Sequence, residues 1–463
     1  MEFVQTQRGD RKLLYQGHLY VKHKSLANGW TSYECDRRRY NNSCRARLRV
    51  RGPEVHVVPG APHTHAPDPS RVEAIKVQSR MKLQAMATQE TPQQILTANL
   101  AATSNATSAK LPGVLDMRRG IRRLRQKAGN PPPLPTTRAE LPNPIPRQYA
   151  TTSQGKNFLA WDSVDADRIL VFATNAALEL LNTSKHRFMD GTFLTTPPLY
   201  AQLYTIHALV DKQTVPCVYA LLPNKTQQTY TRLIRSLLAA NNAIDPESIM
   251  IDFEKAAQQA ANTVFPRASV KGCFFHFSQA IFRHLQSEGL QRRYQEEEDF
   301  ALDARMVAAL AFVPENDIDP AFAVLSQNVD PALAPILDYV EDTFIGSVRR
   351  GQRRRPRFPY SMWGMYERVG ENLPRTNNSV EGWHRGLSSN IGANHVNIWR
   401  FLDVLKREDD LGRITLTHIR QGRQYKPHPQ YAALNARIHH VVETFQALHI
   451  LDYLRAVAYN FSM

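Results

Sequence analysis

The chain has 463 residues, 42 % of them hydrophobic, which is too long for one ordinary domain and sufficient for a large buried core. Its net charge of +16 favours a polyanionic partner such as nucleic acid over a small metabolite; a merely soluble basic protein is the alternative. We expect no membrane span, because no run of about 18 apolar residues occurs, and no secretory signal, because the N-terminus is polar. Only four cysteines are present, which argues against a disulfide scaffold and for a reducing compartment.

Residues 1–70 form a basic block with the pattern of β-strands. The first 52 residues contain 12 lysines and arginines but only 4 acidic residues. The stretch "CRARLRVRG", residues 44–52, alternates between arginines and apolar residues, which is typical of a strand with one solvated, cationic face. We therefore predict a small β-rich domain here.

Four residues of this block are arranged to share one metal ion. His63 and His65 are two apart, and such residues project to the same side of an extended segment. With Cys35 and Cys44 they make a Cys2His2 set suited to tetrahedral zinc, although the spacing is wider than in the usual zinc knuckle. A chance histidine pair is the alternative. We favour zinc, because a β-block with so small a core needs an additional cross-link.

The same segment resembles a FLYWCH-type zinc finger. It shares an aromatic residue before the first cysteine, a C-x8-C spacing, an H-x-H pair, and also Phe3, Gly9, Leu14, Gly17 and Tyr20. The tryptophan that is usual shortly before the first cysteine is Tyr33 here, with Trp30 nearby. The resemblance implies Zn²⁺ on the Cys2His2 set and DNA binding by the finger. The basic side chains that we expect at the DNA are Arg37, Arg38 and Arg39.

Residues 71–156 change character from strands to helices. A moderately polar, helix-compatible run is followed by "NPPPLPTTRAELPNPIPRQY", a proline-rich linker that cannot sustain a helix or a sheet. A probable helix beginning near Pro112 is crowded with basic residues, which suits contact with DNA phosphates or the major groove. A solvated basic helix in a linker is an equally good interpretation. The basic residues of this helix are Arg118, Arg119, Arg122, Arg123, Arg125 and Lys127.

From residue 157 the pattern becomes that of a compact α/β domain, whose first part we predict to end at residue 290. "HRFMDGTF", "AQLYTIHALV" and "TVPCVYALLP" predict an antiparallel meander of three strands, and Pro216 in the third predicts a sheet edge. An amphipathic helix, the buried-strand pattern "SIMIDF", a helix from Glu254, a strand in "SVKGCFFHF" and a helix from about Ser278 follow. The order β-β-β-α-β-α-β-α is that of the ribonuclease H fold.

This order of strands predicts that two acidic residues lie close together. Asp190 lies in the first strand and Asp252 at the end of the fourth, and these strands are neighbours in such a sheet. Buried carboxylates are costly when unpaired, whereas carboxylates that bind divalent cations are compensated. We therefore expect a metal here, and we expect Gly191, beside Asp190, to leave room for metals and a phosphate.

A third acid is expected from a helix that packs under this edge. "RTNNSVEGWHRGL" offers Glu381 near the start of a helix capped by Asn378 or Ser379, within a predicted segment 376–410. Residues 291–375 before it read as a helical insertion, in which two Asp-Pro pairs, at Asp319 and at Asp330, predict helix starts. Residues 411–463 are predicted to be helical and are assigned only to packing or self-association.

Four fragments in order resemble the core of Mutator-like element (MULE) transposases over about residues 157–406. They are "FMDGTF", "MIDFEKAA", "GCFFHF" and "TNNSVEGWHRGL". The family's acidic triad corresponds to Asp190, Asp252 and Glu381, and its C-x2-H signature to Cys273 and His276, which we expect beside the acids rather than in a structural zinc site. Taken alone, each acid would read as a turn, cap or solvated residue, and Cys273 and His276 as core residues.

The resemblance implies a DDE-type transposase. Two Mg²⁺ (or Mn²⁺) ions held by the three carboxylates, with Asp190 bridging them, would support hydrolysis at the element end and then direct transfer of the freed 3′-hydroxyl to target DNA. The fold class that follows is α/β: a ribonuclease H-like catalytic core with a helical insertion, preceded by a small β-rich zinc finger and a helical linker region. A plain ribonuclease H-like nuclease is disfavoured by the finger and the insertion.

The partner that we expect is double-stranded DNA, at the terminal repeats of an element and at the target. Binding would come from the finger, the basic helix and the run "RRGQRRRPRF", which is also typical of a nuclear localisation signal; a solvated loop is the alternative for that run. A homo-oligomer on DNA is left open. The competing function is a domesticated, transposase-derived nuclear DNA-binding protein without cleavage activity. Further residues expected at the DNA are Arg353, Arg354, Arg355 and, just before the acidic helix, Arg375.

Overall fold

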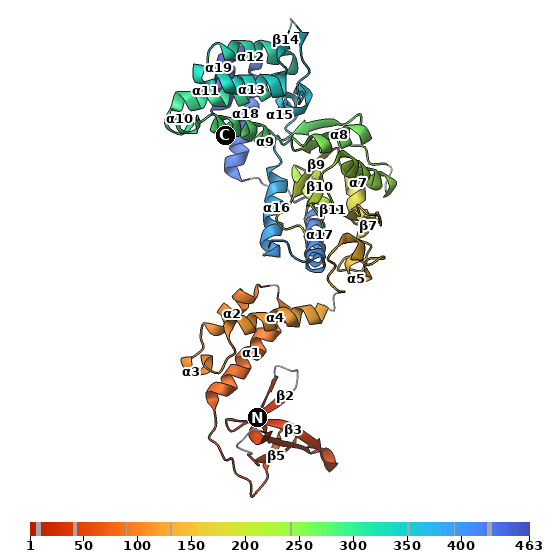
Figure 1. Ribbon diagram of the computed structural model, residues 1–463, viewed down its shortest axis with the longest axis vertical. Helices are drawn as coiled ribbons and strands as arrows, with labels where there is room; N and C mark the ends of the chain where they lie inside the picture. Colours follow the sequence, from red (N-terminus) through yellow and green to blue (C-terminus); the bar gives the residue numbers. More distant parts are fainter. Residues whose placement is uncertain are drawn as a thin grey trace. The chain divides into compact units, whose positions relative to one another are not determined.

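The computed structural model describes residues 1–5, 11–39, 44–88, 90–129, 132–240, 243–349, 352–392, 394–423 and 428–463. The chain is mixed α/β and consists of two compact units, Met1–Pro133 and Leu134–Met463 (Figure 1). None of the helices in these described ranges has the length and apolar character that a membrane span needs.

The first unit begins with a six-stranded antiparallel sheet in which each strand pairs with the next along the chain. The predicted alternation is confirmed, since Leu48 and Val50 are buried while Arg49 between them is exposed. Gly9, one of the residues of the finger pattern, lies outside the described residues. The strands are β1 (Glu2–Gln5), β2 (Arg11–Tyr15), β3 (His18–Ser25), β4 (Thr31–Cys35), β5 (Arg47–Arg51) and β6 (Glu54–Val57).

Helices complete the first unit and have a small core of their own. The N-terminus of α1 is capped by the Asp68 carboxylate, which accepts a hydrogen bond from the Arg71 amide, and that of α2 by a capping box between Thr91 and Gln94. Arg125 of α4 donates hydrogen bonds to the carbonyls of three residues around the α1–α2 turn, so it is structural. The helices are α1 (Pro69–Ala87), α2 (Pro92–Leu100), α3 (Asn105–Ser108) and α4 (Val114–Gly129).

The second unit is built on a seven-stranded sheet with the order β13-β12-β9-β10-β11-β8-β7. Strands β9, β10 and β11 form the predicted antiparallel meander, and β12 lies parallel to both β9 and β13. Two short strands, β7 and β8, extend the sheet beyond β11 and were not predicted. The strands are β7 (Leu159–Asp162), β8 (Leu170–Phe172), β9 (His186–Thr192), β10 (Gln202–Val210), β11 (Gln213–Leu222), β12 (Ser248–Ile251) and β13 (Ser269–Gly272).

The prediction that Pro216 marks a sheet edge is wrong, because β8 pairs with the far side of β11. Proline is tolerated for two local reasons. β8 pairs only with Tyr219–Leu221 and does not reach Pro216, and the β10–β11 register shifts between Ile206 and His207, opposite the proline. The bulge opposite β10 and the lack of a β8 partner at this end of β11 thus remove the need for the N–H donor that proline lacks.

Helices cover both faces of this sheet (Figure 1). Apolar residues of α6, α7 and α8 pack with Met189 and Ile249 on one face. On the other face Val380 of α16 packs with Phe188 and Met250, and α5 and α17 cover β8 and β11. The helices are α5 (Arg147–Ala150), α6 (Asn175–Thr183), α7 (Gln227–Ala240), α8 (Lys255–Val264), α16 (Asn378–Ile391) and α17 (Ile398–Arg420).

The segment between β13 and α16 is helical, as predicted, and the C-terminal helices pack on it, α18 against α15 and α19 against α11 and α12. A two-stranded ribbon, β14 (Val348–Arg349) with β15 (Gln352–Arg353), interrupts it. The helices are α9 (Phe274–Ser287), α10 (Gln291–Glu296), α11 (Glu298–Ala309), α12 (Ile318–Ser326), α13 (Ala334–Val340), α14 (Tyr360–Trp363), α15 (Tyr366–Gly370), α18 (Pro429–Glu443) and α19 (Ile450–Ala458).

Several predicted helix starts differ from the structure. α9 starts four residues earlier than predicted, which makes Cys273 its N-cap. α12 begins before Asp319, so this residue lies in the first turn instead of capping it, whereas Asp330 does cap the turn that follows it. The N-cap of α16 is Asn377, not Asn378 or Ser379. The starts of α9, α12 and α16 differ from the predicted ones by four residues or fewer.

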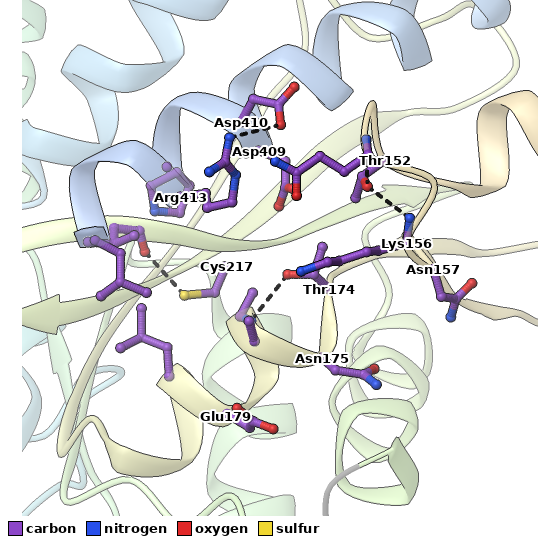
Figure 2. A pocket seen from close by; sticks show the side chains of 18 residues that line it. Thr152, Lys156, Asn157, Thr174, Asn175, Glu179, Cys217, Asp409, Asp410 and Arg413 are labelled. Carbon is purple, nitrogen blue, oxygen red and sulfur yellow. Dashed lines mark hydrogen bonds and ion pairs between the residues drawn. The ribbon is translucent and has the colours of Figure 1, made fainter. Parts of the chain in front are cut away.

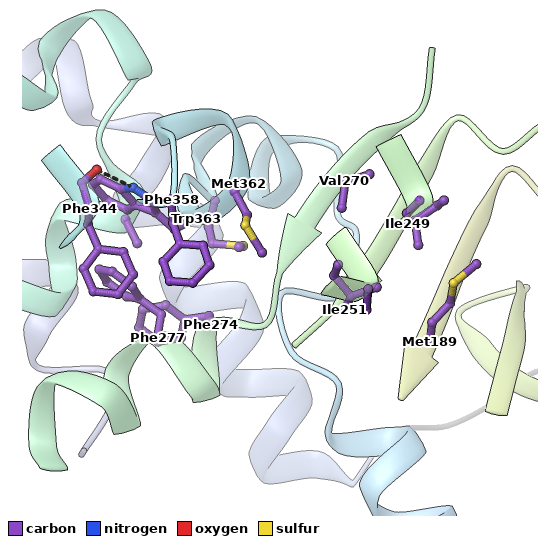
Figure 3. Packing of buried hydrophobic residues seen from close by; sticks show 14 of the residues in the cluster. Met189, Ile249, Ile251, Val270, Phe274, Phe277, Phe344, Phe358, Met362 and Trp363 are labelled. Carbon is purple, nitrogen blue, oxygen red and sulfur yellow. Dashed lines mark hydrogen bonds between the residues drawn. The ribbon is translucent and has the colours of Figure 1, made fainter. Parts of the chain in front are cut away.

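An aromatic cluster joins the helical segment to the sheet edge. Phe277 of α9 stacks on Trp363 with 5.1 Å between ring centroids, beside Phe344 and Phe358 (Figure 3). The ring of Phe253, next to Asp252, packs edge-on against those of Phe344 and Phe358. The ring also covers Gly272 so closely that a Cβ atom there would lie 2.5 Å from it. The glycine is therefore required by packing.

Replacing this glycine is expected to destabilise the second unit. Gly272→Ala places a methyl group against the Phe253 ring, and overpacking of this kind costs about 1–3 kcal/mol in the free energy of unfolding. Urea unfolding followed by tryptophan fluorescence measures the loss, since four of the five tryptophans lie in this unit. Gly386→Ala, in α16 with open space around it, is the matched control and should be neutral or stabilising by up to about 1 kcal/mol.

Candidate active site and metal centre

Three acidic residues from distant parts of the chain lie near the carboxyl ends of two neighbouring inner strands of the seven-stranded sheet. Asp190 is in β9, Asp252 directly follows β12, and Glu381 is in the first turn of α16. Met250 of β12 pairs with Phe188 of β9, and continuing this parallel register by two residues brings Asp252 beside Asp190. The expected proximity of the first two acids follows directly from this pairing.

His276 lies between two of the acids. Its Nδ1 is 2.8 Å from Oδ1 of Asp252, and its Nε2 is 3.5 Å from Oε1 of Glu381. Burial lowers the pKa of His276, but the Asp252 carboxylate and the Cys273 thiol outweigh this effect and raise it to about 11. The two carboxylates therefore favour the charged form of the imidazole, and His276 lies beside the acids as predicted.

Asp190 is the most buried of the three acids, with 7 % of its surface exposed. Its Oδ1 accepts a hydrogen bond from the Gly191 amide at 2.7 Å, and its Oδ2 is 3.4 Å from Nδ1 of His384. Burial and the Asp252 charge raise the pKa of Asp190. The pKa of Glu381 is likewise raised, first by burial and then by Asp190 and Asp252. The pKa values of Asp190 and Glu381 thus both respond to the charge of Asp252.

The donor set of these three acids fits a divalent cation. Oδ1 of Asp252 and Oε1 of Glu381 are buried and face the His276 ring without hydrogen-bond geometry. Hard carboxylate oxygens are the ligands that Mg²⁺ and Mn²⁺ prefer. The acids are not a single tight ligand group in the described structure, because His276 separates Asp252 from Glu381.

Cys273 has a structural role and not that of a metal ligand, because its hydrogen bonds connect three elements. Its backbone amide donates to the carbonyl of Ile251 at 3.0 Å, and its buried Sγ accepts a hydrogen bond from the Asn377 amide at 3.1 Å. One residue thus connects the end of β12, the start of α9 and the start of α16.

The expectation that Gly191 leaves room for a phosphate is wrong, since a Cβ atom there would meet Gln202 and Tyr204.

The predicted zinc ligands come together in the first unit. One ligand atom from each of Cys35, Cys44, His63 and His65 lies within 4.8 Å of all the others. Sγ of Cys35 is 3.2 Å from Nε2 of His65, and Sγ of Cys44 is 3.3 Å from Nδ1 of His63. Zn–S and Zn–N bonds in a tetrahedral site separate sulfur from nitrogen by about 3.5 Å, so the set fits zinc.

Neighbouring groups orient these histidines. Nδ1 of His65 lies 3.0 Å from the Ala66 carbonyl, which leaves Nε2 to face the metal position, and Nε2 of His63 lies 2.7 Å from the Tyr20 hydroxyl. His18, which the sequence did not single out, stacks on His63 with 3.5 Å between ring centroids. Partners of this kind fix ring orientation and tautomer at a metal site.

The basic residues expected at DNA differ in whether their side chains are already paired within the protein. Arg37 and Arg38 are paired with Asp68 and Glu34, and the side chain of Arg39 lies outside the described residues. In α4, Arg118 bonds to Gln93 and Arg119 contacts Asp116, while the next two arginines, Arg122 and Arg123, are exposed. Arg353 is paired with Asp319 and Glu341, and Arg375 donates to Asn435. The exposed residues outside these contacts are Arg122, Arg123, Lys127, Arg354 and Arg355.

A cavity of about 520 Å³ lies elsewhere in the second unit (Figure 2). Its walls come from the loop 152–157, α6, the start of β11 and α17, with Lys156 and Asp409 among them. Burial and then Asp410 raise the pKa of Asp409 to about 6. None of the three acids lines this cavity, so it is separate from the acidic site.

Comparison with known families agrees with both resemblances. Residues 187–280 match the MULE transposase domain, and residues 3–65 match the FLYWCH zinc finger domain. A search of curated proteins found no match. The first match includes Asp190, Asp252, Cys273 and His276 but ends before Glu381. Together the two domains indicate a transposase-related, DNA-binding function, with zinc supported at the N-terminal Cys2His2 set.

Removal of one zinc ligand is expected to release the metal. Cys44→Ser and His65→Ala should each lower the zinc content of the purified protein from about one ion per chain towards zero, as measured by elemental analysis, and should weaken DNA binding. His56→Ala changes an exposed histidine of β6 outside the set and should leave the zinc content unchanged. Full zinc retention in Cys44→Ser would contradict the ligand assignment.

Proposed function

We propose that the chain is a MULE-type DNA transposase that binds the ends of an element, cleaves them by metal-dependent phosphodiester hydrolysis and joins them to target DNA. The observation that carries this proposal is the convergence of Asp190, Asp252 and Glu381 from two neighbouring strands and a helix at the carboxyl ends of those strands. The match of residues 187–280 to the MULE transposase domain supports it.

The sheet order supports a ribonuclease H-like core. An antiparallel meander, β9 to β11, is extended on its first strand by the parallel strands β12 and β13. The elements β9, β10, β11, α7, β12, α8, β13 and α9 follow one another in the order that this fold requires. Strands β7 and β8 would then be an addition at the far edge of the sheet.

Asp190, Asp252 and Glu381 would hold Mg²⁺ or Mn²⁺ in this function. When bound, such ions activate the attacking oxygen and neutralise charge at phosphorus. The raised pKa values of Asp190 and Glu381 are consistent with a site where like charges are crowded and a cation is needed. His276, beside two of the acids, would hold their carboxylates apart and oriented toward the DNA phosphate.

DNA would be bound by parts of both units. The finger and the exposed face of α4 carry positive charge in the first unit, and Arg354 and Arg355 carry it in the second. Such contacts supply affinity that depends strongly on salt and little on base sequence. A nuclear location follows if chromosomal DNA is the substrate. A domesticated nuclear DNA-binding protein is the alternative, and assembly into an oligomer on DNA is compatible with both.

The first test is cleavage of DNA that carries the terminal inverted repeats flanking the coding region. Mg²⁺-dependent nicking should fall at least about 1,000-fold in Asp190→Asn, because the change removes a metal-binding charge with little change in shape. Asp211→Asn, in the exposed turn between β10 and β11, is the matched control; its φ of 46° also suits asparagine. It should nick like wild type.

The outcome separates the two functions. Nicking by wild type and Asp211→Asn but not by Asp190→Asn supports a transposase. If all three proteins bind DNA with the same affinity and none cuts it, the domesticated DNA-binding function is correct instead.

The second test concerns the basic helix α4. Arg122→Ala should weaken DNA binding and make the slope of log K against log salt less steep by about 0.9, the value for one lost phosphate contact, without changing the melting temperature. Arg125→Ala should instead lower the melting temperature of the first unit, because it removes three hydrogen bonds to carbonyls. Titrations at several salt concentrations and thermal unfolding distinguish the two. An unchanged slope in Arg122→Ala would exclude α4 from the interface.

A further inference from the structure

A histidine outside the acidic triad is placed to control the geometry of Asp190. We propose that His384 is a positioning residue, whose Nδ1–H orients the Asp190 carboxylate, and that Thr205 and His207 fix its imidazole in the tautomer that this requires. The inference rests on the proposed function, because it assigns a role around an acid that this function needs.

The four residues form a continuous buried chain. Nδ1 of His384 is 3.4 Å from Oδ2 of Asp190, its Nε2 is 3.1 Å from the Thr205 hydroxyl, and that hydroxyl is 3.1 Å from Nε2 of His207. Thr205 and His207 are fully buried, and His384 is 7 % exposed. Water therefore does not replace these contacts.

Strand pairing explains why the chain forms. Thr205 of β10 pairs directly with Asp190 of β9, so the two side chains lie on the same face of the sheet. His207, two residues further along β10, projects to that face as well. The helix α16 covers this face through Val380, and one turn later it presents His384.

One direction of the hydrogen bonds places a proton between His384 and Asp190. Burial keeps the pKa of His207 well below its usual value, so the ring carries one N–H. If Nε2–H of His207 donates to the Thr205 oxygen, the Thr205 hydroxyl can donate to Nε2 of His384 at 3.1 Å or to the Asp190 carbonyl at 3.3 Å. The shorter contact favours His384. His384 then carries its proton on Nδ1, facing Asp190. Nδ1 of His207 is left as a bare acceptor, in agreement with its lack of a partner in the structure.

The helix thereby contributes twice to the site. Glu381 and His384 are three residues apart in α16 and share one helical face, with Glu381 facing His276 and His384 facing Asp190. The E-x2-H spacing in "VEGWHR" is the sequence signal for this pair. Trp383 adds support, since its ring meets that of His207 edge-on at 5.3 Å.

Two substitutions distinguish a positioning role from simple space filling. Asparagine places its amide nitrogen close to the position of Nδ1, and glutamine places it close to that of Nε2. His384→Asn therefore keeps a donor to Asp190 and loses the Thr205 contact, whereas His384→Gln does the reverse while filling more of the volume. The readouts are Mn²⁺ affinity, taken as the part of Mn²⁺ binding that Asp190→Asn abolishes, and kcat and KM for nicking of the terminal repeats.

We expect His384→Asn to bind Mn²⁺ within about threefold of wild type and His384→Gln to bind it about 10–100-fold more weakly, the usual range for loss of a partner that orients a metal ligand. The kcat for nicking should follow the same order, with KM for DNA unchanged. The proposal is overturned if His384→Gln binds Mn²⁺ as well as His384→Asn does, provided that both variants melt near the wild-type temperature.

A spectroscopic readout keeps this inference separate from the proposed function. In protein labelled with ¹⁵N-histidine, the two-bond correlation spectrum should show His384, assigned by its loss in His384→Asn, with the proton on Nδ1. Thr205→Val, which keeps the shape and removes the hydroxyl, should shift this signal. If wild type shows no Asp190-dependent Mn²⁺ binding, the proposed catalysis fails, and the spectrum alone decides: a proton on Nε2 overturns the positioning role, and a proton on Nδ1 supports it.

Discussion

The parallel pairing of β12 with β9 is the constraint on which the acidic site depends. Asp190 and Asp252 are far apart in the sequence and become neighbours only through this register. A parallel pair cannot be closed by a tight turn and needs a crossover, which the chain supplies through β10, β11 and α7. Because side chains alternate along a strand, a slip of one residue would turn Asp252 to the opposite face. The apolar residues around the register, such as Ile249 and Ile251, therefore protect the site as well as the fold.

The first unit depends on a different kind of interaction. The buried apolar core of its sheet is small, and charged and metal-binding groups also stabilise the unit. Asp36, buried beside the Cys2His2 set, forms ion pairs with Lys12 at 2.7 Å and with Arg71 of α1 at 2.6 Å. Burial opposes the charge on Asp36, but Arg71 and Lys12 prevail and lower its pKa. The ion pair thus joins the finger to the helix that follows it.

Regular, local patterns were predictable from the sequence. The alternation in "CRARLRVRG", the three meander strands and the buried strand around Ile249 are each visible in a short window, and the pairing of Cys35 and Cys44 with an H-x-H motif required only counting. Spatial neighbours were not predictable in the same way. Strand β8 is three residues long, too short for a periodic signal, and it is the strand that makes the edge assignment of Pro216 wrong.

The acidic site shows the same division. The three acids could be chosen because the strand order and the family resemblance both point to them. Thr205 and His207, in contrast, lie in an apolar run of β10 where a threonine and a histidine read as ordinary strand residues. Their relation to Asp190 depends on cross-strand register, and that of His384 depends on how α16 docks. Whether an arginine such as Arg125 binds DNA or supports a turn likewise depends on contacts with residues that are distant in the sequence.

The helical segment from α9 to the residues just before α16 leaves the core and returns to it at one point. The Phe274 amide donates to the Arg375 carbonyl at 3.0 Å, and two residues further on the Asn377 amide reaches Sγ of Cys273. About a hundred residues are thus closed into a loop by a junction of four, and lengthening a closed loop costs little entropy. Evolution can therefore enlarge, shorten or replace the excursion, together with the C-terminal helices that pack on it, while the spacing of the acids is inherited unchanged.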